Sequence, residues 1–173
     1  MMDYLQMAIA GDQKSFEILI NSVKTRLYKT GMAILKNDDD VCDAIQETLL
    51  SAYKNLNALQ NQEYFTTWIT RILINKCYDI IKKGQKLSYL NDKIEANFET
   101  DSYYDNYKEE SVVEVVLEKI DPELKLITVL YYYDEISVKE IAQMLNIPEG
   151  TVKSRLSRAR DKIYAILKEE EVK

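Results

Sequence analysis

Apolar residues recur every three or four positions through most of the chain, a spacing that places them on one face of an α-helix. Almost no segment alternates apolar and polar residues in the way a half-buried strand does. Four glycines and two prolines in 173 residues leave few natural breaks. We therefore expect an all-α protein, with helices over residues 3–35 interrupted near Gly11-Asp12, 41–56, 65–83, 112–134 interrupted at Asp121-Pro122, and 137–168.

Residues 137–168 predict two helices joined by a tight turn. Ser137 and Glu140 have the spacing of a capping box, in which each side chain satisfies the other residue's backbone amide. Asn146-Ile147-Pro148 ends the first helix, because proline disfavours helix in the residue before it. Gly150 is expected to supply the corner. The arrangement is typical of a helix-turn-helix.

The second of these helices, with Thr151 as its expected cap, carries an apolar stripe from Val152 to Ile163 and a cationic opposite face. Six basic residues stand against one acid between residues 151 and 168, in a chain of net charge −6. Three of the five arginines lie between residues 155 and 160, and guanidinium bonds guanine edges or phosphates in a bidentate way. A basic amphipathic helix can be a solvated surface only, but the capped first helix and the turn favour DNA binding.

A second positive patch lies on the helix predicted over residues 65–83. Between residues 71 and 86 five basic residues stand against one acid. Aromatic rings beside a basic surface suit unpaired DNA bases, although Trp68 and Tyr78 fit the apolar stripe of the core. The preceding segment, 55–64, is rich in asparagine and glutamine and predicts a loop. Its amides can bond base edges, or it can be a plain polar connector.

Composition argues against several classes of function. The chain has no histidine, and Cys42 and Cys77 fit neither a CxxC pair nor a disulfide framework. We expect no metal site, no cofactor, no small-molecule substrate and no enzymatic activity. No apolar run approaches the roughly 18 residues that span a bilayer, and no signal-like segment opens the chain. We expect a cytoplasmic protein.

Three stretches resemble one family. Residues 147–160, IPEGTVKSRLSRAR, resemble the recognition helix in region 4 of extracytoplasmic-function (ECF) sigma factors, a minimal class of bacterial transcription initiation factors. Residues 65–79 resemble the signature of region 2 of the same family. Residues 43–53, DAIQETLLSAY, resemble the helix with which the family docks on a coiled coil of the largest polymerase subunit.

The resemblance implies two small helical domains joined by a flexible acidic linker. Residues 1–84 would form region 2, which binds core RNA polymerase and recognises and melts the minus-10 element. Residues 85–111, with seven acids against three lysines, would be the linker. Residues 112–173 would form region 4, whose helix-turn-helix recognises the minus-35 element.

The resemblance also assigns roles to individual side chains. Residues implied to read bases of the minus-35 element are Lys153, Ser154, Ser157 and Arg158, and those implied to hold its phosphates are Arg155, Arg160 and Lys162. Residues implied in contacts with the minus-10 element are Asn75 above all, with Arg71, Lys76, Tyr64, Phe65, Lys82 and Lys83. Residues implied in polymerase binding are Asp43, Gln46 and Glu47.

The implied partners are core RNA polymerase, promoter DNA and an anti-sigma factor, often membrane-anchored, that acts in a cell-envelope stress response. Overall likeness points to the lysozyme-responsive subgroup from Gram-positive bacteria. The carboxy-terminal half alone also permits a stand-alone helix-turn-helix regulator, for which a homodimer reading paired half-sites is expected. An enzyme with an appended DNA-binding domain is a more distant alternative.

Overall fold

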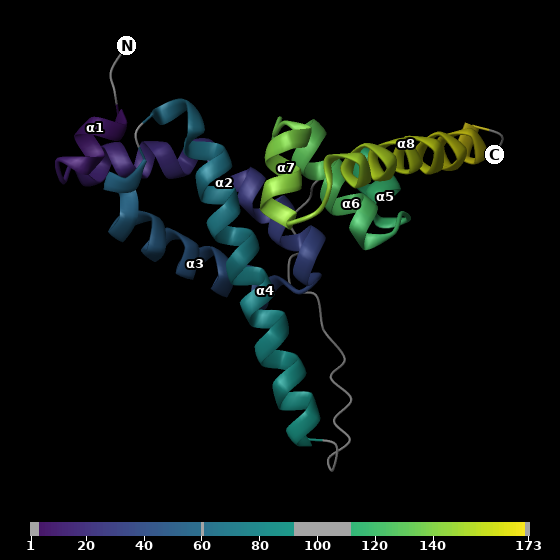
Figure 1. Ribbon diagram of the computed structural model, residues 1–173, viewed down its shortest axis with the longest axis horizontal. Coiled ribbons are helices and arrows are strands. Elements are labelled where there is room, and N and C mark those ends of the chain that lie inside the picture. Colours follow the sequence, from purple (N-terminus) through teal and green to yellow (C-terminus); the bar gives the residue numbers. More distant parts are fainter. Residues whose placement is uncertain (1–3, 60, 92–111, 172–173) are drawn as a thin grey trace. The chain divides into compact units, whose positions relative to one another are not determined.

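The computed structural model in Figure 1 describes residues 4–59, 61–91 and 112–171. The chain divides into two compact units, one within residues 1–101 and one within 102–173. Every element in the described ranges is helical, which confirms the expected fold class. The elements are α1 (Tyr4–Ile9), α2 (Gln13–Leu35), α3 (Asp38–Asn55), the 3-10 turns η1 (Leu56–Ala58) and η2 (Gln62–Tyr64), α4 (Phe65–Asn91), α5 (Val112–Glu118), α6 (Pro122–Thr128), the π-helical turn η3 (Val129–Tyr133), α7 (Val138–Leu145) and α8 (Glu149–Glu171).

Local sequence signals set the helix boundaries in the first unit. Gly11 has a φ of +97°, which separates α1 from α2 at the predicted break. Asp12 then caps α2, with its carboxylate accepting the Ser15 amide at 3.2 Å. Asn37 caps α3 and accepts the Asp40 amide at 3.1 Å. Each cap satisfies a backbone donor that the first helical turn leaves without a partner.

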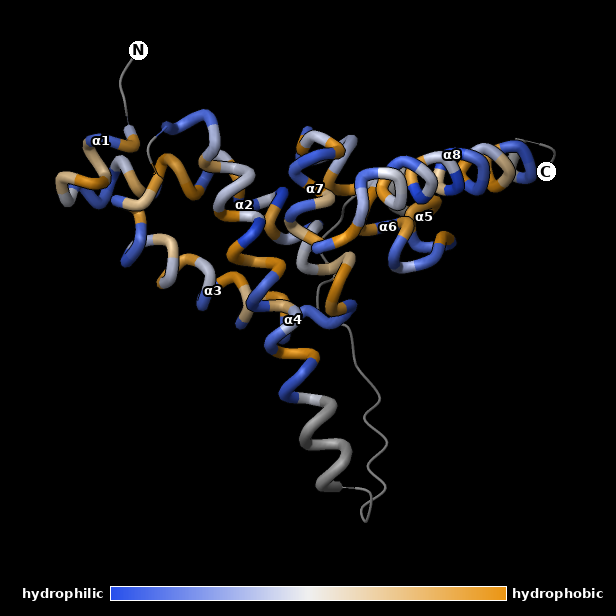
Figure 2. The backbone as a smooth tube through the Cα atoms, viewed as in Figure 1, coloured by the Kyte–Doolittle hydropathy of each residue, from blue (hydrophilic) through white to orange (hydrophobic). Residues whose placement is uncertain are grey.

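The apolar faces of α1 to α4 meet in the core of the first unit, and Figure 2 shows hydrophobic positions recurring among polar ones along these helices. Trp68 and Phe16 pack against this core and are partly exposed. The buried residues of the cluster are Leu5, Ala8, Leu19, Val23, Leu27, Ala44, Ala52, Leu56, Leu59, Phe65, Ile69, Leu73 and Cys77.

A glycine allows α2 and α3 to approach closely. Gly31 lies within α2, and a Cβ added there would sit 2.9 Å from Cγ1 of Val41 on α3. Val41 is fully buried. The contact brings the two helix backbones together and so fixes where the outer face of α3 lies.

The second unit contains the predicted helix-turn-helix, α7 and α8. The Ser137–Glu140 capping box is present at the start of α7, as predicted. Asn146 ends α7 in the left-handed conformation, with φ 53°. A short polar side chain tolerates this conformation better than most, so the turn does not need a glycine.

The start of α8 differs from the prediction. The helix begins at Glu149, so Gly150 and Thr151 lie inside its first turn and are neither the corner nor the cap. The amides of Thr151 and Val152 donate to the carbonyl of Pro148, at 2.9 and 3.2 Å. A backbone carbonyl therefore does what the Thr151 hydroxyl was expected to do.

Three further expectations need correction. The helix expected to end at Lys83 continues to Asn91, and residues 92–111 of the predicted linker lie outside the described residues. The predicted loop at 55–64 contains the two short turns η1 and η2, held by buried Leu56 and Leu59. Tyr131, expected in the core beside Leu124, Ile127 and Leu130, is 37% exposed. The π-helical turn adds a residue to this stretch, so the α-helical spacing no longer points Tyr131 inward.

None of the helices in the described ranges combines the length and the apolar character that a membrane span requires.

Candidate nucleic-acid interface

Helix α8 separates an apolar face from a cationic one, as its sequence predicts. Val152, Leu156 and Ala159 are buried, at 0, 5 and 1% exposure. Their burial against the rest of the unit leaves the opposite side of the helix in solvent. The residues exposed there are Lys153, Ser154, Ser157, Arg158 and Arg160. Two short serines among long cations leave room for a close approach to a groove floor.

Two of the predicted phosphate-binding cations lie on a flank of α8 and contact acids of α6. Nη2 of Arg155 is 2.5 Å from Oε2 of Glu123, and Nζ of Lys162 is 2.5 Å from Oδ2 of Asp121. The hydrogen bond from Lys162 lowers the pKa of Asp121. These four side chains, with Leu124 and Arg158, line a hollow of about 460 Å³.

A second set of predicted DNA contacts lies along α4. Arg71 and Asn75 are exposed one helical turn apart, and Lys82 and Lys83 are exposed further along the helix. Tyr78, which the periodicity placed in the core, is 40% exposed. Its position three residues after Asn75 puts an aromatic ring on this surface, a feature that sequence reasoning missed.

The two aromatic residues at the start of α4 are placed differently from each other. Tyr64, in η2, is 58% exposed. Phe65 is 3% exposed and belongs to the core cluster, with its ring centroid 6.1 Å from that of Trp68. This burial corrects the expectation that the Phe65 ring is available to a DNA base.

The predicted polymerase-binding residues lie on the outer face of α3. Asp43, Gln46 and Glu47 are all exposed. Leu50 and Tyr53, which are 62 and 48% exposed, follow on the same helix. Sequence reasoning did not assign these two, although the spacing of 46, 50 and 53 is that of one helix face.

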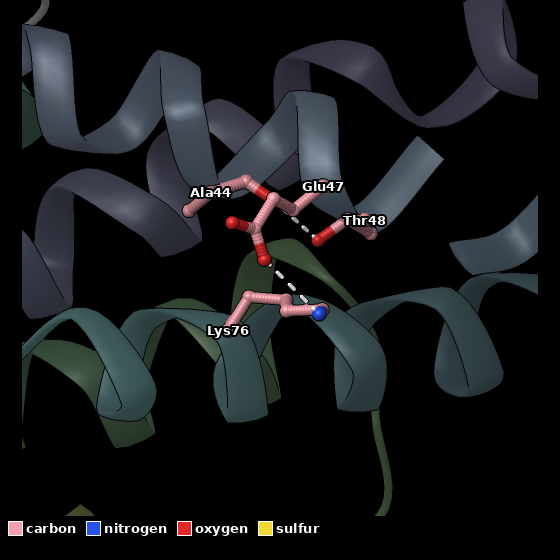
Figure 3. A network of polar contacts seen from close by, with 4 residues as sticks. All are labelled: Ala44, Glu47, Thr48 and Lys76. Carbon is pink, nitrogen blue, oxygen red and sulfur yellow. Dashed lines mark hydrogen bonds and ion pairs between the residues drawn. The ribbon is translucent and has the colours of Figure 1, made fainter. Parts of the chain in front are cut away.

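An ion pair joins this face to the promoter-facing helix. Glu47 reaches from α3 to α4, where its Oε2 is 3.1 Å from Nζ of Lys76 (Figure 3). The hydrogen bond from Lys76 and then its charge lower the pKa of Glu47. On the inner side of α3, the Thr48 hydroxyl donates to the Ala44 carbonyl at 2.7 Å. Lys76, a predicted minus-10 contact, is thus occupied by a predicted polymerase contact.

Two family models match the chain. The model of Sigma-70 region 2 matches residues 19–87, which include α3 and most of α4. The model of Sigma-70, region 4 matches residues 112–163, which include the helix-turn-helix.

Curated proteins similar to the chain include three sigma factors. The ECF RNA polymerase sigma factor SigW of Bacillus subtilis (strain 168) is 31% identical over 173 residues, which cover 92% of each chain. The RNA polymerase sigma factor SigV of the same organism is 28% identical over 140 residues, covering 81% of this chain and 83% of SigV. The ECF RNA polymerase sigma-E factor of Escherichia coli (strain K12) is 30% identical over 166 residues, covering 88% of this chain and 86% of its own.

Two solved structures share the fold. One is the sigma factor RpoE in complex with the anti-sigma factor NepR from Bartonella quintana, with a TM-score of 0.67, 20% identity, and coverage of 90% of this chain and 98% of the other. The second is CnrH in complex with the cytosolic domain of CnrY, with a TM-score of 0.61, 23% identity and coverage of 95% of both chains.

Proposed function

The chain belongs to the ECF group of the sigma-70 family, and we propose that it binds core RNA polymerase and directs transcription initiation at promoters through α8 and α4. The observation that carries this proposal is the arrangement of α8, which buries an apolar stripe and exposes a cationic, serine-containing face. Such a helix fits the major groove, where base edges differ between the four base pairs. The role places the protein in the cytoplasm, with the chromosome.

We assign recognition of the minus-35 element to the exposed face of α8. Lys153, Ser154, Ser157 and Arg158 are the candidate base readers, because they lie on the side opposite the buried stripe. Arg160, exposed at the edge of this face, is the candidate phosphate ligand. Phosphate contacts position the helix, and base contacts supply the selectivity.

We assign recognition of the minus-10 element to the exposed side of α4. The amide of Asn75 has a donor and an acceptor for a base edge, and Arg71 lies one turn away. Lys82 and Lys83 supply positive charge along the same helix. Tyr64 offers an exposed ring on which an unpaired base can stack.

We assign polymerase binding to the outer face of α3. Asp43, Gln46 and Glu47 supply polar contacts, and Leu50 and Tyr53 add exposed apolar surface beside them. Interfaces of this kind combine an apolar centre with a polar rim. The family resemblance suggests a coiled coil of the largest polymerase subunit as the surface that α3 contacts.

We infer control by an anti-sigma factor. The RpoE structure named above holds an anti-sigma factor, and the CnrH structure holds a cytosolic domain of a second protein. A partner that covers the faces of α3, α4 or α8 would block polymerase or promoter binding until it is removed. The finer assignment to the lysozyme-responsive subgroup has the 28% identity to SigV in its favour.

We also propose the domain limits of region 2 at residues 1–84 and of region 4 at residues 112–173. The family models support them with matches to residues 19–87 and 112–163.

Run-off transcription from a library of promoter fragments tests the function. Core polymerase should initiate at a defined subset of fragments only when this protein is added. Arg158→Ala should relax selection at the upstream element, and Asn75→Ala should relax selection at the downstream element. Lys168→Ala, near the end of α8, and Asn21→Ala, on α2, are exposed controls and should leave selection unchanged.

Failure of initiation, together with duplex binding by a homodimer, would replace this proposal with the stand-alone regulator.

A further inference from the structure

Two cations of the recognition helix already have acidic partners within their own unit. Arg155 and Lys162 are seven residues apart on α8, which is two helical turns, so they lie on the same flank. Glu123 and Asp121 are two residues apart at the start of α6 and contact these cations in reverse order, Glu123 with Arg155 and Asp121 with Lys162. The contacts form two successive links between α6 and α8.

The packing of α6 against α8 keeps these links in place. Leu124 of α6 and Ala159 of α8 belong to one buried cluster, at 6 and 1% exposure. Leu124 directly follows Glu123, so burial of its side chain fixes the backbone that presents the carboxylate. Pro122 adds stiffness there, since its φ is preset for the first turn of a helix.

Of the two links, the Arg155 link is the more shielded. The Arg155 side chain is only 24% exposed, while that of Lys162 is 53% exposed. Highly exposed pairs exchange readily with water and salt. A guanidinium that is mostly covered keeps its partner longer and has less surface to offer to a phosphate. Arg158 and Arg160, by contrast, are exposed.

We propose that Glu123, assisted by Asp121, limits the affinity of this protein for DNA by holding Arg155 on α6 and away from the phosphate backbone. The inference rests on the proposed function of α8. It makes Arg155 a positioning residue for the recognition helix and leaves phosphate contact to cations such as Arg160. Each phosphate contact withdrawn in this way weakens all DNA sequences equally, because phosphates carry no sequence information.

The consequence is that binding depends more on base reading and on engagement of the second promoter element. A phosphate contact adds about 0.9 to the slope of log affinity against log salt concentration. Releasing Arg155 should therefore steepen that slope by about 0.9. Since four to the power 0.9 is about 3.5, one added contact amounts to roughly a threefold change in affinity over a fourfold change in salt.

The test uses the full chain bound to core polymerase, with a promoter duplex and a mixed-sequence duplex of equal length, over a series of KCl concentrations. Glu123→Gln should bind both duplexes more tightly at low salt, by about threefold, with the steeper slope. The matched control is Glu118→Gln, which removes an exposed acid of the same charge on α5 and should change neither quantity.

A second comparison separates release of Arg155 from a general change in charge. Arg155→Gln should leave the salt slope nearly unchanged, while Arg160→Gln should flatten it by about 0.9. In the Arg155→Gln background, Glu123→Gln should no longer raise affinity. Thermal unfolding of each variant checks that the unit remains folded.

Two results would overturn the inference and leave the proposed function intact. The first is an Arg155→Gln variant whose slope falls as much as that of Arg160→Gln. The second is a gain from Glu123→Gln that persists without Arg155. If instead the complex shows no preference for promoter DNA and Arg158→Ala has no effect, the proposed function fails and the inference fails with it.

Discussion

Replacing Gly31 with alanine tests whether the close approach of α2 and α3 holds the first unit together. The added Cβ would lie 2.9 Å from Cγ1 and 3.4 Å from Cγ2 of Val41. Val41 is 0% exposed. A β-branched residue in a helix has one strongly preferred rotamer, so its methyl groups have no easy way to move aside. Either α3 shifts outward or the core of the unit is compressed.

The expected magnitude follows from two opposing effects. Glycine in a helix interior is less favourable than alanine by about 1 kcal/mol, which favours the substitution. Overpacking a closely packed core costs about 1–3 kcal/mol, which opposes it. The net loss of unfolding free energy should be about 1 kcal/mol. Gly84 provides a matched control in α4, because its added Cβ meets nothing within 4 Å.

The difference between the two variants isolates the clash, because both gain the same helix propensity. Gly84→Ala should stabilise the unit by about 1 kcal/mol, and Gly31→Ala should fall below it by about 1–3 kcal/mol. Urea unfolding followed by the fluorescence of Trp68, the one tryptophan in the chain, reports on this unit. With a slope of about 1 kcal/mol per molar urea, the two midpoints should differ by about 1 M or more.

A double variant tests the contact itself. Val41→Ala removes both methyl groups, and the atom that then remains near the new Cβ is the Val41 Cβ, at 3.6 Å. In that background Gly31→Ala should behave as Gly84→Ala does and stabilise the unit. The reasoning is refuted if Gly31→Ala by itself stabilises the protein as much as Gly84→Ala. Because α3 carries the proposed polymerase contacts, Gly31→Ala should also weaken binding to core polymerase.

Two further predictions concern titratable groups. Cys77 is 0% exposed and burial raises the pKa of its thiol to about 12, so in a Cys42→Ser variant a thiol reagent should label Cys77 only as fast as Trp68 fluorescence reports unfolding. Rapid labelling of the folded protein would contradict the buried placement. The hydroxyl of Ser15 donates to the Asp12 carboxylate at 2.5 Å and lowers its pKa below the ordinary 3.8. The resulting stability should be full above that ordinary value and should be lost as pH falls through the lowered pKa. Asp12→Asn should therefore lose less stability between pH 5 and pH 3 than the wild type, measured by urea midpoints, and an equal loss would argue against the contact.

The sequence predicts the helices and their buried faces because both depend on local order. Periodicity identifies the stripe of α8, which the structure buries from Val152 to Ala159. Capping chemistry identifies the start of α7 at Ser137 and of α3 at Asn37. These signals act within a turn or two of helix, so neighbouring residues along the chain determine them.

Local spacing predicts less well where the backbone departs from regular helix. Tyr131 follows the apolar spacing of α6 and is nevertheless exposed, because the π-helical turn rotates it outward. Phe65 and Tyr64 are adjacent aromatic residues of similar size, and only the packing of η2 and α4 decides that one is buried and the other exposed.

The sequence by itself determined the all-α fold, the two cationic surfaces and the family. The tertiary structure alone decided which of the charged side chains on those surfaces pair with one another. Arg155 meets Glu123 and Lys76 meets Glu47 across helices far apart in the sequence. Helical spacing states which way a long side chain leaves its own helix, but the acid it reaches depends on how a second helix packs beside it.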